Sequence, residues 1–132
     1  MIIDTSAILA ILGDEPERKA LIQCIIKASD KGLSAASFVE TSIVLKARYG
    51  YDGVRDFDLF LAKAGIILIT IDVEQAQVAR QAFKKYGKGR HVAGLNFGDC
   101  FSYAAAKSRN EPLLFKGNDF SQTDITVCKY ER

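Results

Sequence analysis

The sequence predicts an α/β fold in which a mainly parallel sheet of about five strands is flanked by helices. Short apolar segments alternate along the chain with longer segments whose apolar residues recur at helical spacing. The apolar segments are typical of strands that helices cover on both faces. The 132 residues contain no repeat, low-complexity tract or linker, so residues 1–132 are expected to form a single domain.

Four of the five expected strands are strongly apolar, and the remaining one is limited to Leu33 and Ser34. The strands cover residues 1–3, 33–34, 66–70, 113–115 and 125–127. The expected helices cover residues 21–29, 38–47, 56–64, 72–86 and 97–109. Residues that stop helices follow four of these five segments, namely Gly32, Gly50, Gly65 and Pro112.

The composition excludes several classes of protein. Hydrophobic residues make up 48% of the chain and charged residues 26%, as in a globular protein and unlike a disordered one. No apolar run approaches the roughly 20 residues of a membrane span, and the N-terminus lacks the pattern of a secretory signal. Cys24, Cys100 and Cys128 have neither zinc-site spacing nor a disulfide framework, so we interpret them as thiols of a cytoplasmic protein. The net charge of +2 neither requires nor excludes a nucleic-acid partner.

Four acidic residues far apart in the sequence are expected at one end of the sheet. Asp4 directly follows the first strand, and Glu40 lies in the first turn of the helix after the second strand. Asp99 opens the last helix, and Asp119 follows the fourth strand. In an open α/β sheet, ligands bind beyond the carboxyl ends of the strands, where loops and helix starts meet. We therefore expect these four side chains to project into one cleft.

Four carboxylates in one cleft raise one another's pKa unless a cation balances their charge. Hard divalent cations prefer oxygen ligands, so the cluster predicts one or two Mg²⁺ or Mn²⁺ ions. Such ions polarise phosphoryl oxygens, generate a nucleophile from water and stabilise the leaving oxygen. The pattern therefore predicts a metal-dependent nuclease.

Each of the four acids also has a purely structural interpretation. Glu40 ends a capping-box sequence that begins at Ser37, and Asp99 lies favourably near a helix N-terminus. Asp4 is suited to cap a short helix, and Asp119 belongs to a Gly-Asn-Asp run of the kind found in surface turns. The joint pattern favours the functional interpretation over these separate ones.

Two further acids are assigned to structure alone. Asp72 also follows a strand, but the residues after it read as a helix with an acidic first turn, so Asp72 is expected to be its cap. Asp124 could be either an acid that supports the metal ligands or a turn residue before the last strand, and the turn is favoured. Neither is expected to bind a metal ion.

Four segments around the candidate acids resemble the motifs of the PIN domain, and specifically of the toxin in a VapBC-type toxin–antitoxin pair. Met-Ile-Ile-Asp-Thr-Ser-Ala-Ile contains Asp4, and Ala-Ser-Phe-Val-Glu-Thr contains Glu40. Phe-Gly-Asp-Cys-Phe-Ser-Tyr-Ala contains Asp99, and Leu-Leu-Phe-Lys-Gly-Asn-Asp-Phe contains Asp119. The motifs span nearly the whole chain in the expected order. One position departs from the pattern, because Asn118 stands where related sequences often have an acid.

The resemblance implies a three-layer PIN-like fold and an endoribonuclease that depends on Mg²⁺ or Mn²⁺. We expect Asp4, Glu40 and Asp99 to form the main metal site, with Asp119 completing it directly or through water. The resemblance also implies a homodimer and a small VapB-like antitoxin that wraps the toxin and blocks its cleft. Members of the family cut structured RNAs such as tRNA or rRNA.

Hydroxyl and basic side chains are candidates for holding the RNA. Thr5 or Ser6 is expected either to orient a water molecule or phosphate, or simply to belong to a helix cap. A basic segment formed by Lys84, Lys85, Lys88, Arg90 and His91 precedes Asp99 in the sequence. Its cations are expected either to contact the RNA backbone, which would make binding sensitive to salt, or to form an ordinary solvated charge run.

Other classes of function compete with this interpretation. A haloacid-dehalogenase-type enzyme needs a second aspartate two residues after the first, where this chain has Ser6. A response-regulator receiver needs an acidic pair early in the chain, and Asp4 stands alone. A PIN-fold module that binds a protein or RNA with weak or no catalysis is the non-enzymatic alternative, and Asn118 supports it. Stabilisation by Mn²⁺ would separate a metal-dependent enzyme from such a module.

Overall fold

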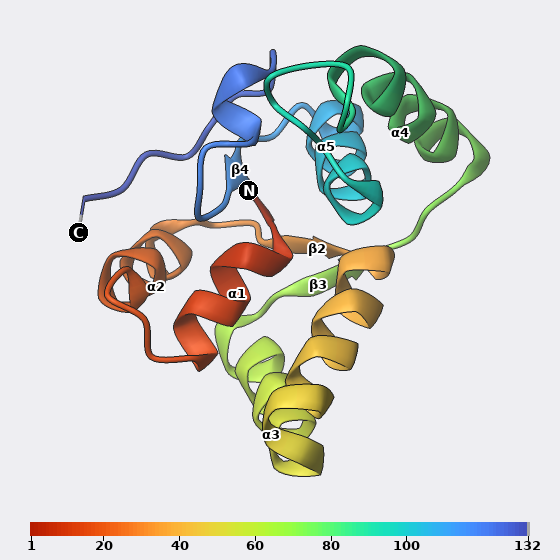
Figure 1. The fold of residues 1–132 in the computed structure, drawn as a ribbon. Helices are drawn as coiled ribbons and strands as arrows, with labels where there is room; N and C mark the ends of the chain where they lie inside the picture. The colour runs from red at the N-terminus through yellow and green to blue at the C-terminus, as the bar shows by residue number, and fades with distance from the viewer. Residues whose placement is uncertain (132) are drawn as a thin grey trace.

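The fold is built on a sheet of four parallel strands, seen in the computed structural model, which describes residues 1–131 (Figure 1). The strand order is β3-β2-β1-β4. The strands are β1 (Ile2–Ile3), β2 (Gly32–Ser34), β3 (Ile67–Ile69) and β4 (Leu113–Leu114). The predicted parallel α/β sheet is thus confirmed. The fifth predicted strand, 125–127, is reduced to one parallel bridge between Val127 and Leu113.

Five α-helices and one short 3₁₀ helix surround the sheet within the described residues. They are α1 (Thr5–Leu12), α2 (Arg18–Lys27), α3 (Ala35–Ala64), α4 (Val73–Tyr86), α5 (Phe97–Arg109) and η1 (Phe120–Gln122). The sequence pattern indicated α1 only as a short helix that Asp4 was suited to cap. Its residues are almost entirely apolar, so α1 lacks the amphipathic spacing by which the other helices were predicted.

Helix α3 is a hairpin of two helical arms, which correspond to the two helices predicted before and after Gly50. Gly50 has φ 71° and ψ −157°, a conformation that glycine adopts without steric cost and that ends the first arm. Figure 1 shows the second arm returning beside the first. A side chain at Gly53 would collide with the backbone of Leu45, so glycine is needed there for the close packing of the arms.

Two hydrophobic cores lie on opposite faces of the sheet, which gives the three layers that were predicted. Ile2 and Leu113 pack against α4 and α5 in one core. Ile3, Leu33 and Leu114 pack against α1, α2 and α3 in the other. Successive residues of a strand point to opposite faces, so β1 and β4 each supply one residue to each core. No helix in the described part of the chain is long and apolar enough to cross a membrane.

Candidate active site

Asp4 lies where β1 ends and α1 begins. Its Oδ2 accepts a hydrogen bond from the Ser6 backbone N–H at 3.0 Å, so the predicted helix-capping role is present. Its Oδ1 accepts a second hydrogen bond from the Ser102 hydroxyl of α5. The side chain is only 5% exposed, and both of these bonds fix the direction in which its oxygens point. A cap alone does not require the second bond, which ties Asp4 to the helix that bears Asp99.

Glu40 lies on the first arm of α3, one turn farther from the helix start than the sequence suggested. Ser34 is the N-cap of α3, and its hydroxyl accepts a hydrogen bond from the Ala36 N–H at 3.3 Å. The capping box predicted for Ser37 and Glu40 is therefore wrong, because both residues lie inside the helix. The Glu40 carboxylate extends instead to the start of α5 and lies against Gly98. If position 98 carried a Cβ, that atom would lie 2.7 Å from Glu40 Oε1.

Asp99 lies in the first turn of α5 and completes the capping box of that helix. Its backbone N–H donates to Asn96 Oδ1 at 2.9 Å, and its Oδ2 accepts from the Asn96 N–H at 3.0 Å. The predicted position at a helix start is thus confirmed. The capping box fixes the carboxylate at the end of α5 that faces Glu40.

Asp119 follows β4 and directly precedes η1, with an exposed side chain that makes no capping hydrogen bond to that helix. The loop before it is anchored to α1, because the Lys116 N–H donates to Ser6 Oγ at 3.0 Å. The Lys116 ammonium also pairs with Glu15 and Glu17. This anchoring holds the loop beside Asp4 while the carboxylate of Asp119 stays available.

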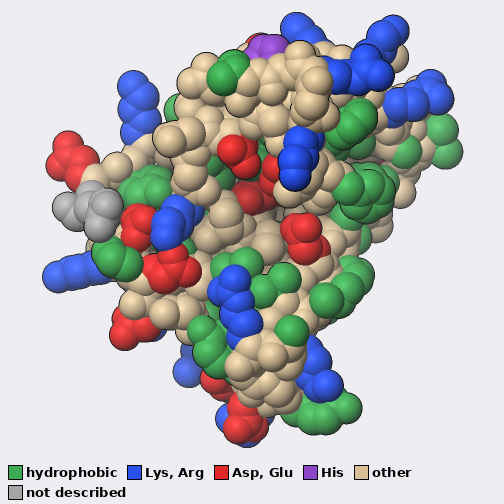
Figure 2. All heavy atoms as spheres, in the orientation of Figure 1, with side chains coloured by type: hydrophobic (Ala, Val, Ile, Leu, Met, Phe, Trp, Pro, Cys, Tyr) green, Lys and Arg blue, Asp and Glu red, His purple; other side chains and the backbone are tan. Residues whose placement is uncertain are grey.

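Three of the acids act electrostatically on the fourth, Asp99. The pKa of Asp99 is raised to about 7, mainly by burial, although the hydrogen bond from the Asn96 N–H lowers it. The negative charges of Asp4, Asp119 and Glu40 each contribute to this rise. Figure 2 shows Asp and Glu side chains gathered in a hollow near the middle of the face it presents. The structure therefore brings all four predicted acids to one edge of the sheet.

The donors in this cluster fit a hard divalent cation. All four are carboxylates, which are the ligands that Mg²⁺ and Mn²⁺ prefer. The charged side chains that shift the pKa of Asp99 are all acids, namely Asp4, Asp119 and Glu40. Among residues 1–131, however, no three His, Cys, Asp or Glu side chains are placed so that they could hold a metal ion together. The argument for a divalent cation thus rests on the chemistry of the four carboxylates and on the electrostatic effect of three of them on Asp99.

Comparison with known proteins identifies the family. Residues 1–125 match the PIN domain. This chain belongs to the PIN domain family. A ribonuclease VapC of Mycolicibacterium smegmatis is 50% identical over 127 residues, which are 96% of this chain and 98% of that protein.

Two solved structures share the PIN fold of this chain. One is Mycobacterium tuberculosis VapC20, described as a Sarcin-Ricin loop cleaving toxin, with a TM-score of 0.79, 14% identity and coverage of 97% of this chain and 98% of that one. The other is a toxin–antitoxin complex from Klebsiella pneumoniae, with a TM-score of 0.74, 17% identity and coverage of 99% and 98%. At these identities the similarity shows the fold alone.

A buried network of hydroxyl groups supports the Asp4 carboxylate of this PIN domain, and sequence reasoning missed most of it. The Ser102 hydroxyl, which bonds Asp4, also lies 3.2 Å from the hydroxyl of Ser37 on α3. The Thr5 hydroxyl donates to the Ser37 carbonyl at 3.3 Å and accepts from the Thr41 hydroxyl at 3.0 Å. One signal was available for Ser102, since a residue three positions after Asp99 lies on the same face of a helix.

The two predicted hydroxyl candidates have different surroundings. Thr5 is buried, and its hydroxyl already donates one hydrogen bond and accepts another within the network. Ser6 Oγ accepts from the Lys116 N–H, which joins α1 to the loop before Asp119. These contacts favour a structural role for Thr5, and they attach Ser6 to the loop that leads to Asp119.

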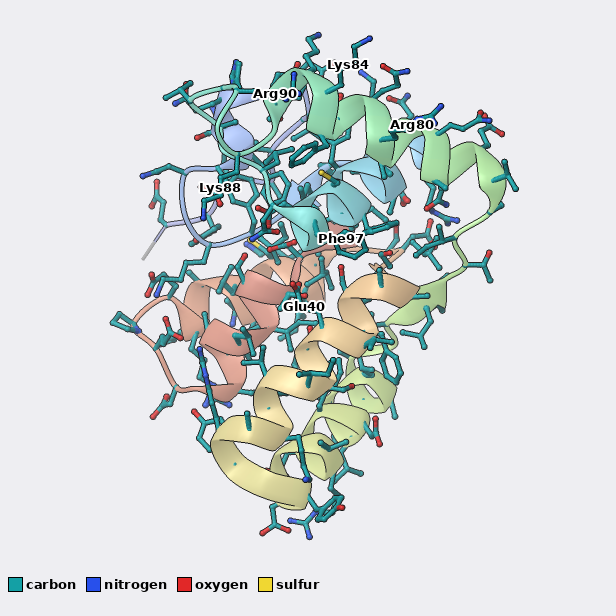
Figure 3. All side chains as sticks on the ribbon, turned by 45° about the vertical axis from the view of Figure 1, so that its right-hand side comes forward. Glu40, Arg80, Lys84, Lys88, Arg90 and Phe97 are labelled. Carbon is teal, nitrogen blue, oxygen red and sulfur yellow. The ribbon has the colours of Figure 1, made fainter. Side chains whose placement is uncertain are left out.

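The basic segment of the PIN domain spans the end of α4 and the loop before α5. Its predicted cations, Lys84, Lys85, Lys88 and Arg90, are all exposed. The loop is pinned by the Gly87–Leu95 bridge, and His91 Nδ1 accepts from the Ala93 N–H at 3.0 Å. Figure 3 shows Lys88 extending on the side of the loop nearer Glu40, while Arg80, Lys84 and Arg90 lie farther away around α4.

The two acids that were assigned to structure alone make structural contacts. Asp72 Oδ1 accepts from the Gln75 N–H at 2.8 Å and is the N-cap of α4, as predicted. Asp124 does more than form a turn, because it accepts from the Tyr103 hydroxyl and from the Lys107 ammonium at 2.8 Å. These bonds lower the pKa of Asp124 to about 2. They attach the C-terminal segment to α5.

Proposed function

We propose that this chain is an endoribonuclease that depends on Mg²⁺ or Mn²⁺ and hydrolyses phosphodiester bonds in RNA. The observation that carries the proposal is the convergence of Asp4, Glu40, Asp99 and Asp119, seen in the pKa of Asp99, which the other three acids raise. A relative that is 50% identical over 96% of this chain is named a ribonuclease, which supports the same activity here.

In this proposal Asp4, Glu40 and Asp99 hold one or two ions, and Asp119 completes the site directly or through water. A bound ion polarises the scissile phosphate, lowers the pKa of the attacking water and stabilises the leaving oxygen. The chain supplies rigid positions for the ligand oxygens. Ser6 and Ser102 orient Asp4, and the capping box orients Asp99. Rigid supporting contacts of this kind preserve the geometry that catalysis needs.

Cleavage of RNA by the purified protein tests the proposal. Antitoxin-free protein is incubated with total cellular RNA in the presence of Mg²⁺, Mn²⁺ or EDTA, beside Asp99→Asn and Asp72→Asn. We expect discrete cuts that disappear with EDTA and in Asp99→Asn, which removes a ligand charge but keeps an acceptor for the capping box. Asp72→Asn changes an aspartate to asparagine at the cap of α4, which is not among the acids that raise the pKa of Asp99, and it is expected to retain activity.

Undiminished cleavage by Asp99→Asn would refute the site assignment. The alternative is a PIN-fold module that binds RNA or protein without cutting. It would be favoured if the folded wild-type protein cleaves no RNA with either metal and its Tm does not rise with Mn²⁺. Asn118→Asp would then show whether restoring an acid at that position restores metal binding.

We further propose that the substrate is a structured RNA such as tRNA or rRNA, contacted along its backbone by Lys84, Lys85, Lys88 and Arg90. The exposure of these four cations supports this role, as does the position of Lys88 on the side nearer Glu40 (Figure 3). The description of VapC20 as a Sarcin-Ricin loop cleaving toxin is consistent with a structured rRNA target. Sequencing of the cut ends from the cleavage experiment would identify the substrate.

A VapB-like antitoxin is the protein partner that we propose. The complex from Klebsiella pneumoniae pairs a chain of the same fold with an antitoxin. The negative charge around Asp99 suits an arginine of such a partner, because a guanidinium forms strong hydrogen bonds with carboxylates. Binding of this kind would place a cation where the metal is expected and would block the cleft.

We propose that the protein is a single-domain cytoplasmic homodimer. Exposed large apolar side chains on α3, on the edge strand β3 and at the starts of α4 and α5 support dimerisation, because exposed apolar surface marks protein interfaces. They are Val39, Ile43, Ile67, Leu68, Val73 and Phe97. Light scattering of the wild type and of Ile43→Glu would test this assignment, with a monomeric variant as the expected result.

A further inference from the structure

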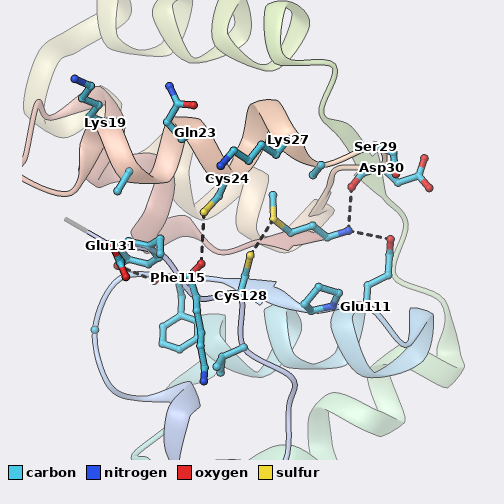
Figure 4. Close-up of a pocket in the computed structure, with 18 residues that line it drawn as sticks. Lys19, Gln23, Cys24, Lys27, Ser29, Asp30, Glu111, Phe115, Cys128 and Glu131 are labelled. Carbon is cyan, nitrogen blue, oxygen red and sulfur yellow. Dashed lines mark hydrogen bonds and ion pairs between the residues drawn. The ribbon is translucent and has the colours of Figure 1, made fainter.

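Three sulfur atoms from separate parts of the chain converge away from the four acids. Met1 Sδ lies 3.6 Å from Cys128 Sγ. Burial raises the pKa of the Cys128 thiol in the C-terminal segment, and the neighbouring thiol of Cys24 on α2 raises it as well. Cys24 Sγ also lies 3.8 Å from the carbonyl oxygen of Lys129, the residue after Cys128. All three sulfur-bearing residues line one open cavity of about 1370 Å³ (Figure 4).

The separation of the Met1 and Cys128 sulfurs suits ligation of a single ion. A metal–sulfur bond of about 2.3 Å places two sulfurs of the same ion about 3.8–4.0 Å apart in tetrahedral or trigonal geometry. The separation of 3.6 Å between Met1 Sδ and Cys128 Sγ is close to that value. The Met1 backbone is held in place, because its ammonium donates to the Asp30 carbonyl at 2.9 Å and to Glu111 at 3.0 Å.

The donor set selects a soft metal ion. Thiolate and thioether sulfurs favour Cu(I), whereas carboxylate clusters favour Mg²⁺ and Mn²⁺. Structural Zn²⁺ requires four protein ligands, and these residues provide three sulfurs. Two thiolates and one monovalent cation form a complex with a net charge of −1. Three lysines and three acids line the same cavity, and one of the acids, Glu111, is paired with the Met1 ammonium; the six are Lys19, Lys27, Lys129, Asp30, Glu111 and Glu131.

We propose that Met1, Cys24 and Cys128 form a binding site for a soft monovalent metal ion, Cu(I). Binding forms two thiolate–metal bonds and one thioether–metal bond, and it releases the two thiol protons to solvent without oxidation or reduction of either partner. The bound ion joins the N-terminus, α2 and the C-terminal segment. It therefore stabilises the folded protein by an amount that grows with the logarithm of its affinity.

Anaerobic titration of the reduced full-length protein with Cu(I), in competition with a chromogenic Cu(I) chelator, tests the site. We expect one equivalent to bind, with an ultraviolet thiolate-to-copper charge-transfer band and a rise in Tm. Cys24→Ser and Cys128→Ser should each weaken binding about 100-fold or more, since ligand loss should cost at least as much as loss of a supporting contact. Cys100→Ser is the matched control, because Cys100 is buried in the core on the other face of the sheet.

The single methionine of the chain allows a test of the thioether. Growth with norleucine replaces only the sulfur of Met1 and preserves the length of the chain. We expect weaker Cu(I) binding than in the wild type, with both thiolate ligands retained. Melting curves of the metal-free variants show whether each is folded, and Cys→Ala versions replace any Ser variant that is not.

The proposal is overturned if Cu(I) binds equally well to the wild type and to both folded Cys24 and Cys128 variants, or if Cys100→Ser lowers affinity as much as they do. It is also overturned if the reduced wild-type protein binds no Cu(I). A disulfide between Cys24 and Cys128 in the oxidised protein would not change that conclusion. None of these outcomes depends on nuclease activity, so the proposed function and the copper site are tested separately.

Discussion

Asp99 combines a structural and an electrostatic constraint in one side chain. Its carboxylate completes a capping box, yet burial, and to a smaller extent three neighbouring acids, raise its pKa to about 7. A carboxyl group whose folded pKa lies above its ordinary value of 3.8 contributes most to stability when it is protonated. That contribution is lost as pH rises from about 4 through about 7. Without metal, Asp99 is therefore expected to destabilise the fold at high pH.

Asp99→Asn should consequently stabilise the metal-free protein while it abolishes cleavage. In EDTA at pH 8 we expect the free energy of unfolding to rise by about 1–2 kcal/mol. This figure allows for solvent screening, because the pKa shift of a partly exposed carboxyl group overstates its effect on stability. The gain should shrink toward zero near pH 4, where the wild-type carboxyl is protonated too. Thermal melts of both proteins in EDTA across this pH range provide the measurement. A variant less stable than the wild type at pH 8 would contradict the electrostatic account.

Ser102 acts on the site through Asp4. Its hydroxyl is fully buried, donates to Asp4 Oδ1 and lies 3.2 Å from the Ser37 hydroxyl. Ser102→Ala should weaken Mn²⁺ binding about 10- to 100-fold, the usual effect of removing a group that orients a metal ligand. Isothermal titration with Mn²⁺ measures the change.

Ser42→Ala is the matched control for Ser102→Ala. Its hydroxyl donates to the Phe38 carbonyl at 2.7 Å within α3 and makes no contact with the four acids. The control should therefore keep the Mn²⁺ affinity of the wild type. If both variants lose affinity equally, Ser102 supports the fold in general and does not position Asp4 in particular.

At the scale of the elements, the start of α5 is shaped to receive Glu40 from α3. Gly98 leaves the space that the Glu40 carboxylate occupies, and an added Cβ would lie 2.7 Å from Glu40 Oε1. The capping box of Asn96 and Asp99 fixes this helix end. A side chain at position 98 is thus expected to displace Glu40 and leave the helix start in place.

Gly98→Ala should separate activity from stability. Cleavage should fall at least about 10-fold, as expected for a misplaced catalytic group. Stability should change little, because Glu40 is a flexible side chain and alanine favours helix by about 1 kcal/mol over glycine. RNA cleavage assays and thermal melts give the two readouts. A large loss of stability would instead indicate that α5 has shifted.

Sequence patterns predicted elements well where the information is local. The two helices around Gly50 and the cap at Asp72 follow from backbone conformation and short-range hydrogen bonds. The predicted start of α3 was wrong. Ser34 and Ser37 are both suited to cap a helix, and Ser34 is the cap because β2 ends there. The strand expected at 125–127 pairs at Val127 alone, which depends on packing that local sequence does not contain.

The same contrast applies to the candidate site. Asp4 and Asp119 could be placed together because each follows a strand, and the carboxyl ends of parallel strands meet at one edge. Ser102 could not be placed, because its bond to Asp4 joins residues 98 positions apart and depends on the rotation of α5. Topological rules thus located the acids, whereas the contacts that orient them required the structure.

At the scale of the whole molecule, negative and positive charge lie on adjoining regions. The four acids lie where β1, α3 and α5 meet, and the basic segment lies on the end of α4 and the loop that leads to α5. Figure 3 shows Lys88 on the side of that loop nearer Glu40. A phosphate backbone held by these cations would present a phosphodiester to the acids. The net charge of +2 is too small to attract RNA without such a local concentration of cations.

Neutralising Lys88 and Arg90 should therefore weaken RNA binding in a way that depends on salt. Each contact with a single-stranded phosphate contributes about −0.7 to the slope of log affinity against log salt concentration, so Lys88→Ala with Arg90→Ala should reduce the slope by about 1.4. Filter binding in EDTA, which prevents cleavage, gives the slopes. Arg48→Ala with Lys63→Ala removes two equally exposed cations from α3 and should leave the slope unchanged. Equal slopes for both pairs would mean that the basic segment is an ordinary solvated surface and that the RNA reaches the acids by another path.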